Sequence, residues 1–265
     1  MAYLVRSLRL VVLGGGISYR ALFNWTTPPM FVGTLLVSPL FQIFFFVFIG
    51  RQLGVADDRF YLIGNTVLAA SVSCVYGGVI AVANERRYGT LGAVLLSPRA
   101  RTLLWGGRTL PYVLNGILVM AFMLLTGSLF LGLDLRVTSL TGVTGIFLMA
   151  ATSCTFFGLA LGALAVRLRD VFVLSNIAFT LLILLSGANL PEEAMPTWMR
   201  TVGACLPLSH SIEALRALFS GASAAAVWSH LRWEVAVALG YALLAMTLLR
   251  FFEKRSRANA ALELM

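Results

Sequence analysis

The chain has 265 residues, of which 59% are hydrophobic and only 12% are charged, and its mean hydropathy is +0.90. A soluble domain averages about 25% charged residues. A chain this apolar with so few charges does not stay dissolved in water. The composition therefore excludes a soluble globular protein and indicates an integral membrane protein. The net charge of +9 does not indicate binding to nucleic acid, because the basic residues lie between apolar segments instead of on one soluble surface.

The first 24 residues have the pattern of a basic amphipathic helix that lies on a membrane surface. Arg6, Arg9 and Arg20 alternate there with leucines and valines. The alternative is a simple basic leader before the first membrane span. Residues 11–16 are short and lack a cleavage site, so we expect no cleavable signal peptide.

Six apolar segments follow, each about as long as the hydrocarbon core of a bilayer requires. They are residues 30–49, 60–83, 112–131, 141–166, 171–187 and 233–252. The sequence therefore predicts an all-α polytopic membrane protein, a single domain over residues 1–265 with six transmembrane helices.

Charged residues are rare in these six segments. The first five contain no Asp, Glu, Lys or Arg. Glu234 and Arg250 lie near the ends of the sixth, where we expect their long side chains to reach the lipid headgroups. In the fourth segment Gly158 and Gly162 are spaced for close packing against another helix.

The distribution of basic residues predicts the orientation in the membrane. Fourteen of the 20 lie on one side of the predicted spans and six on the other. Basic residues favour the cytoplasmic side, so we expect both termini and the connections at 84–110 and 167–170 in the cytoplasm. The six on the external side are Arg51, Arg59, Arg136, Arg200, Arg216 and Arg232.

The external connection at 188–232 is unusually long and predicts two short helices that enter the outer leaflet and return. Prolines at 191, 196 and 207 interrupt it, and residues 209–220 have an amphipathic helical pattern in which Glu213 and Arg216 can form a pair. Backbone that does not span is tolerated at this depth only where it packs on protein or lines a wet cavity. We therefore expect this connection to cap an internal path.

The sequence lacks the chemistry of several membrane-protein classes. No charged residue lies near the middle of a span, which disfavours proton- or sodium-coupled transport and intramembrane proteolysis. His210 and His230 fall in the external connection, where a surface or hydrogen-bonded role is expected. No Gly-x-x-x-x-Gly-Lys motif is present to bind nucleotide phosphates. The chain is therefore not expected to be an enzyme, and any energy must come from a partner.

Two segments resemble signatures of one known family. Residues 84–98 read NERRYGTLGAVLLSP, which is similar to the Glu-Arg-x-x-Gly-Thr signature after the second span of type-2 ABC exporter permeases. This family includes the daunorubicin/doxorubicin export permease. The external segment, with Leu-Pro at 190–191, Pro196, Trp198, Pro207 and residues 212–216, resembles the family's C-terminal signature. The two matches lie in the long connections of the predicted topology, at 84–110 and 188–232.

The resemblance implies roles for particular residues. Residues 1–24 would be the connecting helix, and the coupling helix at 84–96 would dock on a separate ATP-binding subunit. The coupling residues would be Glu85, Arg86, Arg87, Tyr88, Gly89 and Thr90. We expect Glu85 to pair with a basic neighbour on the connecting helix. The alternative is a solvated ion pair at the surface. The residues of the outer gate would be Pro191, Pro196, Trp198 and Pro207.

The resemblance also implies a translocation path lined by the second and fifth spans. The polar residues of this path would be Asn65, Ser73, Tyr76, Asn176 and Thr180. The alternative role for each is a hydrogen bond between helices of one subunit. Their uncharged character suits an amphiphilic solute.

Together these features predict the permease subunit of an ATP-driven ABC exporter in a bacterial inner membrane. It would work with two copies of an ATP-binding subunit and with a second permease copy, either identical or a sister chain. The chain itself would bind no cofactor, because ATP and Mg²⁺ belong to the partner subunit. The alternatives are a permease for a lipid-linked glycan and a non-transporting membrane scaffold or immunity protein.

Overall fold

The computed structural model describes residues 12–17, 19–20, 27–54, 56–90, 101–133, 139–165 and 171–258. Within these ranges the chain forms helices joined by turns, with no strand. The helices in chain order are α2 (Pro28–Val32), η1 (Gly33–Val37), α3 (Ser38–Leu53), α4 (Asp58–Arg87), α6 (Arg101–Leu131), α7 (Leu140–Ala165), α8 (Val171–Leu185), η2 (Glu192–Ala194), α9 (Thr197–Cys205), α10 (Ser209–Phe219) and α11 (Ala224–Ala258).

The prediction of an all-α polytopic membrane protein is confirmed. Five helical segments in the described ranges are long and apolar enough to cross a bilayer: the joined α2, η1 and α3, then α4, α6, α7 and α11. The fifth predicted span, residues 171–187, corresponds to α8, which is apolar but has only 15 residues. The two short helices predicted before the last span are α9 and α10.

Two predicted boundaries differ from the structure. The connection expected at 84–110 is largely helical, because α4 continues to Arg87 and α6 already begins at Arg101. The coupling helix expected at 84–96 therefore starts inside α4, and its residues 91–96 lie outside the described ranges. Helix α11 begins at Ala224, before the predicted start at 233, because the polar residues ahead of the apolar segment continue the same helix.

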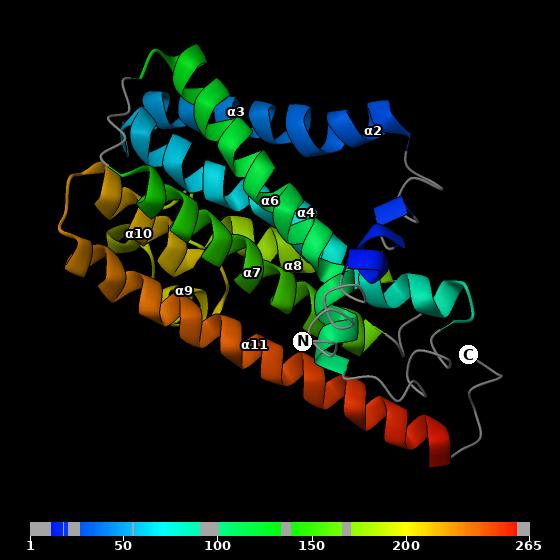
Figure 1. The fold of residues 1–265 in the computed structure, drawn as a ribbon. Helices are drawn as coiled ribbons and strands as arrows, with labels where there is room; N and C mark the ends of the chain where they lie inside the picture. The colour runs from blue at the N-terminus through cyan, green and yellow to red at the C-terminus, as the bar shows by residue number, and fades with distance from the viewer. Residues whose placement is uncertain are drawn as a thin grey trace.

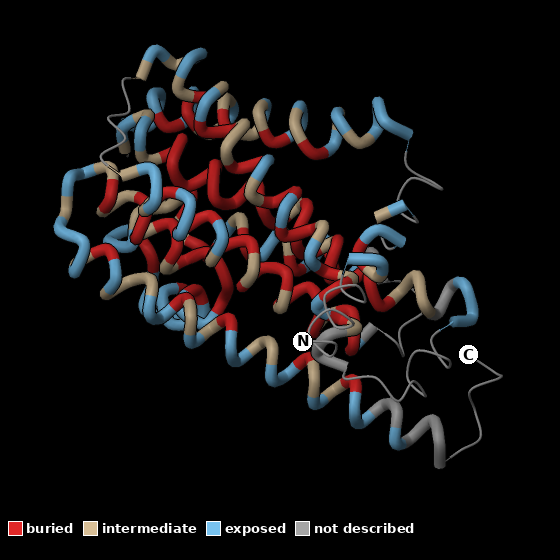
Figure 2. The backbone as a smooth tube through the Cα atoms, viewed as in Figure 1, coloured by how far each residue is buried: buried red, intermediate tan, exposed pale blue. Residues whose placement is uncertain are grey.

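The core of the bundle is formed by α4 and α7 (Figure 1). Both are mostly buried, whereas α3 and α11 lie on opposite sides of the bundle and expose most of their length (Figure 2). Gly158 and Gly162 of α7 face the backbone of α4, where a Cβ on Gly158 would lie 2.4 Å from the carbonyl oxygen of Val75. The predicted close packing at this pair is confirmed, since only a residue without a side chain fits there.

The first span changes its helical type near its beginning. Residues Gly33–Val37 are π-helical, and the N–H of Ser38 donates to the carbonyl oxygen of Gly33, five residues earlier. Pro39 follows, and it has no N–H to continue an α-helical ladder. A π-helical turn accommodates this gap and often marks a functional position.

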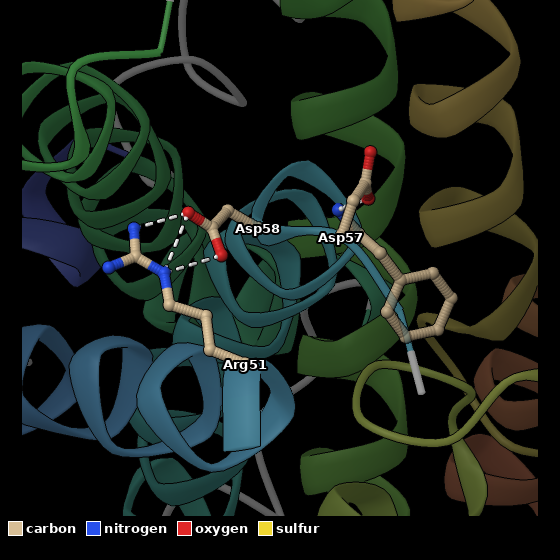
Figure 3. Close-up of polar contacts among 4 residues, drawn as sticks. Arg51, Asp57 and Asp58 are labelled. Atoms are coloured by element: carbon tan, nitrogen blue, oxygen red, sulfur yellow. Dashed lines mark hydrogen bonds and ion pairs between the residues drawn. The ribbon is translucent and has the colours of Figure 1, made fainter. Parts of the chain in front are cut away.

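The turn between α3 and α4 is fixed by two acidic side chains (Figure 3). Asp58 binds Arg51 through Nε and a guanidinium nitrogen, and the Nε–Oδ1 distance is 3.0 Å. Asp57 accepts a hydrogen bond of 2.9 Å from the N–H of Phe60, as an N-cap of α4 does. This end of the bundle also carries α9 and α10 and is called the α10 end; the opposite end, where α4 finishes, is called the Glu85 end (Figure 1).

Only part of the predicted N-terminal amphipathic helix is described. Residues 12–17 and 19–20 are helical, and the other residues of 1–24 lie outside the described ranges. A Cβ on Gly15 would lie 2.8 Å from the carbonyl oxygen of Gly107, so this short helix packs against α6. The hydroxyl of Tyr19 donates to Oδ1 of Asn115, also on α6, at 3.4 Å.

Candidate functional site

A cavity of about 430 Å³ lies between the first span, α4, α6 and α8. Tyr76, in its wall, precedes Glu85 by nine residues, about 14 Å along the helix, so the cavity belongs to the half of the bundle nearer the Glu85 end. None of the described residues that line it is charged. Its apolar wall includes Phe31, Leu35, Val72, Ile80 and Phe179, and its polar side chains are Thr34, Ser38, Gln42, Ser73, Tyr76, Tyr112 and Asn115.

The structure brings together some of the predicted path residues. Ser73 and Tyr76 line the cavity, and the hydroxyl of Tyr76 donates to Oδ1 of Asn176 on α8. Ser73 also donates to the carbonyl oxygen of Tyr112 at 3.3 Å. Thr180 lies on the exposed face of α8, where its hydroxyl bonds at 2.9 Å to the carbonyl oxygen of Asn176 in its own helix.

Asn65 lies apart from the cavity wall and is only 2% exposed. Gln42, which does line the cavity, donates to Oδ1 of Asn65 at 3.2 Å. Asn65 in turn donates at 2.7 Å to Oδ1 of Asn189, in the turn after α8. A row of three amides thus connects the cavity wall with the α10 end, because each amide both donates and accepts.

Glu85 pairs with Arg108 of α6. The Nη2–Oε1 distance is 2.9 Å, and the two side chains are only 15% and 17% exposed. Thr90 also donates to Oε2 of Glu85 at 2.6 Å. The expectation of a basic neighbour is confirmed by Arg108, whereas Arg6 and Arg9 of the predicted connecting helix lie outside the described residues.

The chain leaves α4 in a defined turn after Glu85. The N–H of Thr90 donates to the carbonyl oxygen of Glu85, and Gly89 adopts φ +68°. This is a Schellman ending, for which glycine is preferred because a side chain strains the left-handed conformation. Tyr88, Gly89 and Thr90 are exposed, so the end of α4 presents a short, rigid, accessible turn.

At the α10 end, Glu234 of α11 is fully buried, with 0% exposure. Its carboxyl oxygens accept hydrogen bonds from the N–H groups of Leu208 at 3.0 Å and Ser211 at 3.1 Å. Glu234 therefore caps the first turn of α10, and the expectation that it reaches the headgroups is wrong. Leu208 has φ +80°, an uncommon conformation for a branched residue, and this hydrogen bond helps to hold it.

Arg216, also on α10, is bound by backbone carbonyl groups. Its Nη2 donates to Gly187 at 2.9 Å and to Ala188 and Phe60 at 3.3 Å, and the guanidinium lies 3.6 Å from the centre of the Phe60 ring. Burial lowers the pKa of Arg216 to about 10, which still leaves the group charged near neutral pH. The predicted pair with Glu213 is replaced by these contacts.

Glu213 instead belongs to an acidic group near the surface. His230 Nδ1 lies 2.9 Å from Oε2 of Glu213. The carboxyl group of Glu192, on η2, hydrogen-bonds Glu213, and this contact raises the pKa of Glu192 to about 7. Among the described residues, no group of three His, Cys, Asp or Glu side chains could hold a metal ion.

The predicted gate residues delimit the short helices at the α10 end. Pro191 and Pro196 are the N-caps of η2 and α9, as their fixed φ favours, and Pro207 lies in the turn between α9 and α10. Trp198 lies on α9 and is 61% exposed. Of the coupling residues, Arg86 and Arg87 are in the last turn of α4, but the structure does not describe their side chains.

The sequence did not single out Gln42, Asn189 or Arg108, and it did not indicate that Glu234 caps α10. Gln42 and Asn189 could have been found as polar residues within or beside apolar segments, the same signal that indicated Asn65 and Asn176. The position of Glu234, ten residues after the start of α11, follows only once the true beginning of that helix is known. No local signal links Arg108 to Glu85, because the pair joins two helices.

Comparison with known proteins gives a consistent result. Residues 52–247 match the family model described as ABC-2 family transporter protein. The chain is 27% identical over 187 residues to a relative in Escherichia coli K12 called "Probable multidrug ABC transporter permease YbhR", and equally to its counterpart in E. coli O157:H7. The match covers 68% of this chain and 49% of each relative, so the chain spans about half the length of the curated relatives it matches. No solved structure gave a significant match.

The matched region begins in the last turns of α3 and extends into α11, so it contains the α4 to α8 wall of the cavity, the Glu85–Arg108 pair and both short helices at the α10 end. A family model that covers these elements in one continuous stretch agrees with a polytopic helical bundle. The chain belongs to the ABC-2 family of transporter proteins.

Proposed function

We propose that the chain is the permease subunit of an ATP-driven ABC exporter that moves an amphiphilic, drug-like or lipid-like solute out of the cell. The cavity between the first span, α4, α6 and α8 carries this proposal. It combines apolar walls with uncharged hydroxyl and amide groups, and about 430 Å³ falls in the range of pockets that bind drug-sized molecules. Such a lining binds an amphiphile without the cost of burying an unpaired charge.

The proposed orientation places the Glu85 end in the cytoplasm of a bacterium and the α10 end outside. The excess of basic residues beside the Glu85 end supports it. The cavity then lies at the depth of the cytoplasmic leaflet, and the short helices at the α10 end form an outer gate that includes Pro191, Pro196, Trp198 and Pro207.

The Glu85 end is proposed to dock on an ATP-binding subunit. Tyr88, Gly89 and Thr90 form the accessible turn, and Glu85 ties this turn to α6 through Arg108. Because α4 also forms a wall of the cavity, a push on the turn reaches Ser73 and Tyr76 through one continuous helix. Two ATP-binding subunits, holding ATP and Mg²⁺, would act on two permease copies.

The exposed face of α8 is the proposed contact with the second copy. Asn176 and Thr180 lie on it among Ile177, Leu181 and Leu184. Polar side chains on a face turned away from the bundle are unfavourable against lipid, but they can form hydrogen bonds across a helix interface. The cavity volume supports a solute smaller than a lipid-linked glycan, and the family match argues against a non-transporting scaffold.

Reconstitution with the cognate ATP-binding subunit tests the proposal. In proteoliposomes, amphiphilic fluorescent dyes should stimulate ATP hydrolysis and accumulate in inverted vesicles, and replacing Tyr76 by Trp should suppress both by filling the cavity. A Trp in place of Leu239, exposed on α11, is the matched control and should have no effect. An assembled complex that hydrolyses ATP but neither responds to nor moves any of a panel of amphiphiles would contradict the proposed substrate class.

A further inference from the structure

The turn after α8, residues 186–190, is called the outer turn. It packs directly on the beginning of α4: a Cβ on Gly64 would lie 2.4 Å from the carbonyl oxygen of Ala188. Gly187 has φ +76°, and Ala188 is fully buried. The outer turn thus closes the space between α8 and α4 at the α10 end.

Arg216 is the side chain that joins the outer turn to both neighbouring helices. One guanidinium nitrogen reaches the carbonyl oxygens of Gly187 and Ala188 in the turn and that of Phe60 in α4. The ring of Phe60 covers the guanidinium at 3.6 Å, a favourable distance for a cation and an aromatic face. Arg216 therefore contacts every element that meets at this point.

The hydrogen bonds of Arg216 to the carbonyl groups can be exchanged for contacts with other groups. The partners are neutral carbonyl groups, and two of the three distances are 3.3 Å, so each bond is weaker than one to a carboxylate. The acidic groups Glu213, Glu192, Glu193 and Asp57 surround Arg216 and favour its charged form. A cation that leaves the carbonyl groups would therefore find carboxylates nearby.

The other end of α10 is held differently. Glu234 binds the N–H groups of Leu208 and Ser211 from a fully buried position on α11. These two hydrogen bonds and the packing of α10 along α11 keep α10 with α11 when the contacts of Arg216 to the outer turn break. The outer turn is then the part that moves relative to α10.

We propose that Arg216 is a positioning residue of the outer gate, which keeps the outer turn closed over the beginning of α4 until the guanidinium releases the carbonyl groups of Gly187 and Ala188. The proposal rests on the proposed function for the direction of transport. The closure itself can be measured without ATP or solute.

Accessibility of the outer turn to a maleimide reagent provides the test. Ala188→Cys is introduced into a Cys205→Ser background, because Cys205 is exposed whereas Cys74 and Cys154 are buried. The full-length protein in proteoliposomes is labelled with a membrane-impermeant maleimide. Arg216→Gln should raise the labelling rate of Cys at position 188 at least about tenfold, because the lost charged hydrogen bonds favour the open turn.

Arg200→Gln is the matched control, since it removes the same charge from an exposed position on α9 and should change the rate less than about twofold. Phe60→Leu, which keeps Arg216 but removes the ring above it, should give an intermediate increase of about threefold. If Arg216→Gln does not assemble, the labelling rate of Phe60→Leu tests the proposal in its place. Unchanged labelling in the assembled variants, or an equal increase in Arg200→Gln, would overturn the proposal. If the variants change the labelling rate as expected but the wild-type complex exports no dye, the proposed function is overturned and the role of Arg216 is not.

Discussion

Glu85 and Arg108 at one end of the helix bundle are held differently from Glu234 and Arg216 at the other. At the Glu85 end, Glu85 and Arg108 form a direct ion pair that remains partly exposed. At the α10 end, Glu234 is fully buried and Arg216 is half-buried, and both bind mainly backbone groups. Opposite charges in contact stabilise each other across two helices, whereas a charge on backbone dipoles fixes the position of a turn or a helix end.

The difference suits the two proposed tasks. A docking surface must stay rigid while a partner presses on it, and the Glu85–Arg108 pair braces the turn at Tyr88 and Gly89 against α6. A gate must open and close, and carbonyl groups release a cation more readily than a carboxylate does. Four predictions test this comparison, in order of expected effect.

The largest effect is expected at Glu234. Glu234→Ala leaves the N–H groups of Leu208 and Ser211 unpaired in a buried site, which should cost about 2–4 kcal/mol of unfolding free energy. Glu234→Gln retains an acceptor and should lose about half as much. SDS-titration unfolding in mixed micelles measures both. Glu193→Ala, at an exposed position on η2, is the control, and equal stability of Glu234→Ala and wild type would show that the cap has no structural role.

The next effect concerns coupling at the Glu85 end. Glu85→Ala and Arg108→Ala should each assemble and hydrolyse ATP but lose most dye export, and the double variant should be no worse than either. Their coupling energy in a double-mutant cycle of stability should be about 1 kcal/mol. The exposed pair of Arg51 and Asp58 should show a smaller coupling and no effect on export (Figure 3). Additive effects of Glu85→Ala and Arg108→Ala would mean that the pair does not act as a unit.

A moderate effect is expected in the cavity. Tyr76→Phe removes the hydrogen bond to Asn176, worth about 1 kcal/mol, and should raise the dye concentration that half-stimulates ATP hydrolysis about fivefold. Thr180→Val, which removes a hydroxyl bonded within its own helix, should change it little. The opposite ranking would place the path along the exposed face of α8 instead of inside the cavity.

The smallest effect is a pH dependence at Glu192. The hydrogen bond to Glu213 raises the pKa of Glu192 from an ordinary 4.5 to about 7, so the contact is stable below pH 4.5 and is lost as the pH rises through 7. Because the site is largely exposed, solvent screens the effect. The labelling rate at position 188, divided by the rate of the unfolded protein at the same pH to remove the titration of the thiol itself, should rise slightly between pH 5 and pH 8, and Glu192→Gln should flatten this profile. An unaltered profile in that variant would show that Glu192 does not cause the pH dependence.

Much of the fold could be predicted because it follows from local composition. The apolar length of each segment indicated five of the spans directly, and glycines at 158 and 162 indicated close packing against another helix, which the structure identifies as α4. The site was only partly predictable. Ser73 and Tyr76 were found as polar residues in an apolar span, but their hydroxyl groups face partners 39 and 100 residues away. No sequence window contains both members of such a pair.

The sequence by itself determined the class of the protein: a chain with 59% hydrophobic residues must place most of its side chains in lipid or in a core, and the motifs at 84–98 and 190–216 pointed to a type-2 ABC exporter permease. The tertiary structure decided which partner each charged residue binds. Glu85 pairs with Arg108 on α6, and Glu234 binds the first turn of α10. Arg216 binds the carbonyl groups of the outer turn. A buried charge takes the partner that packing brings within hydrogen-bond distance, and packing depends on the whole bundle.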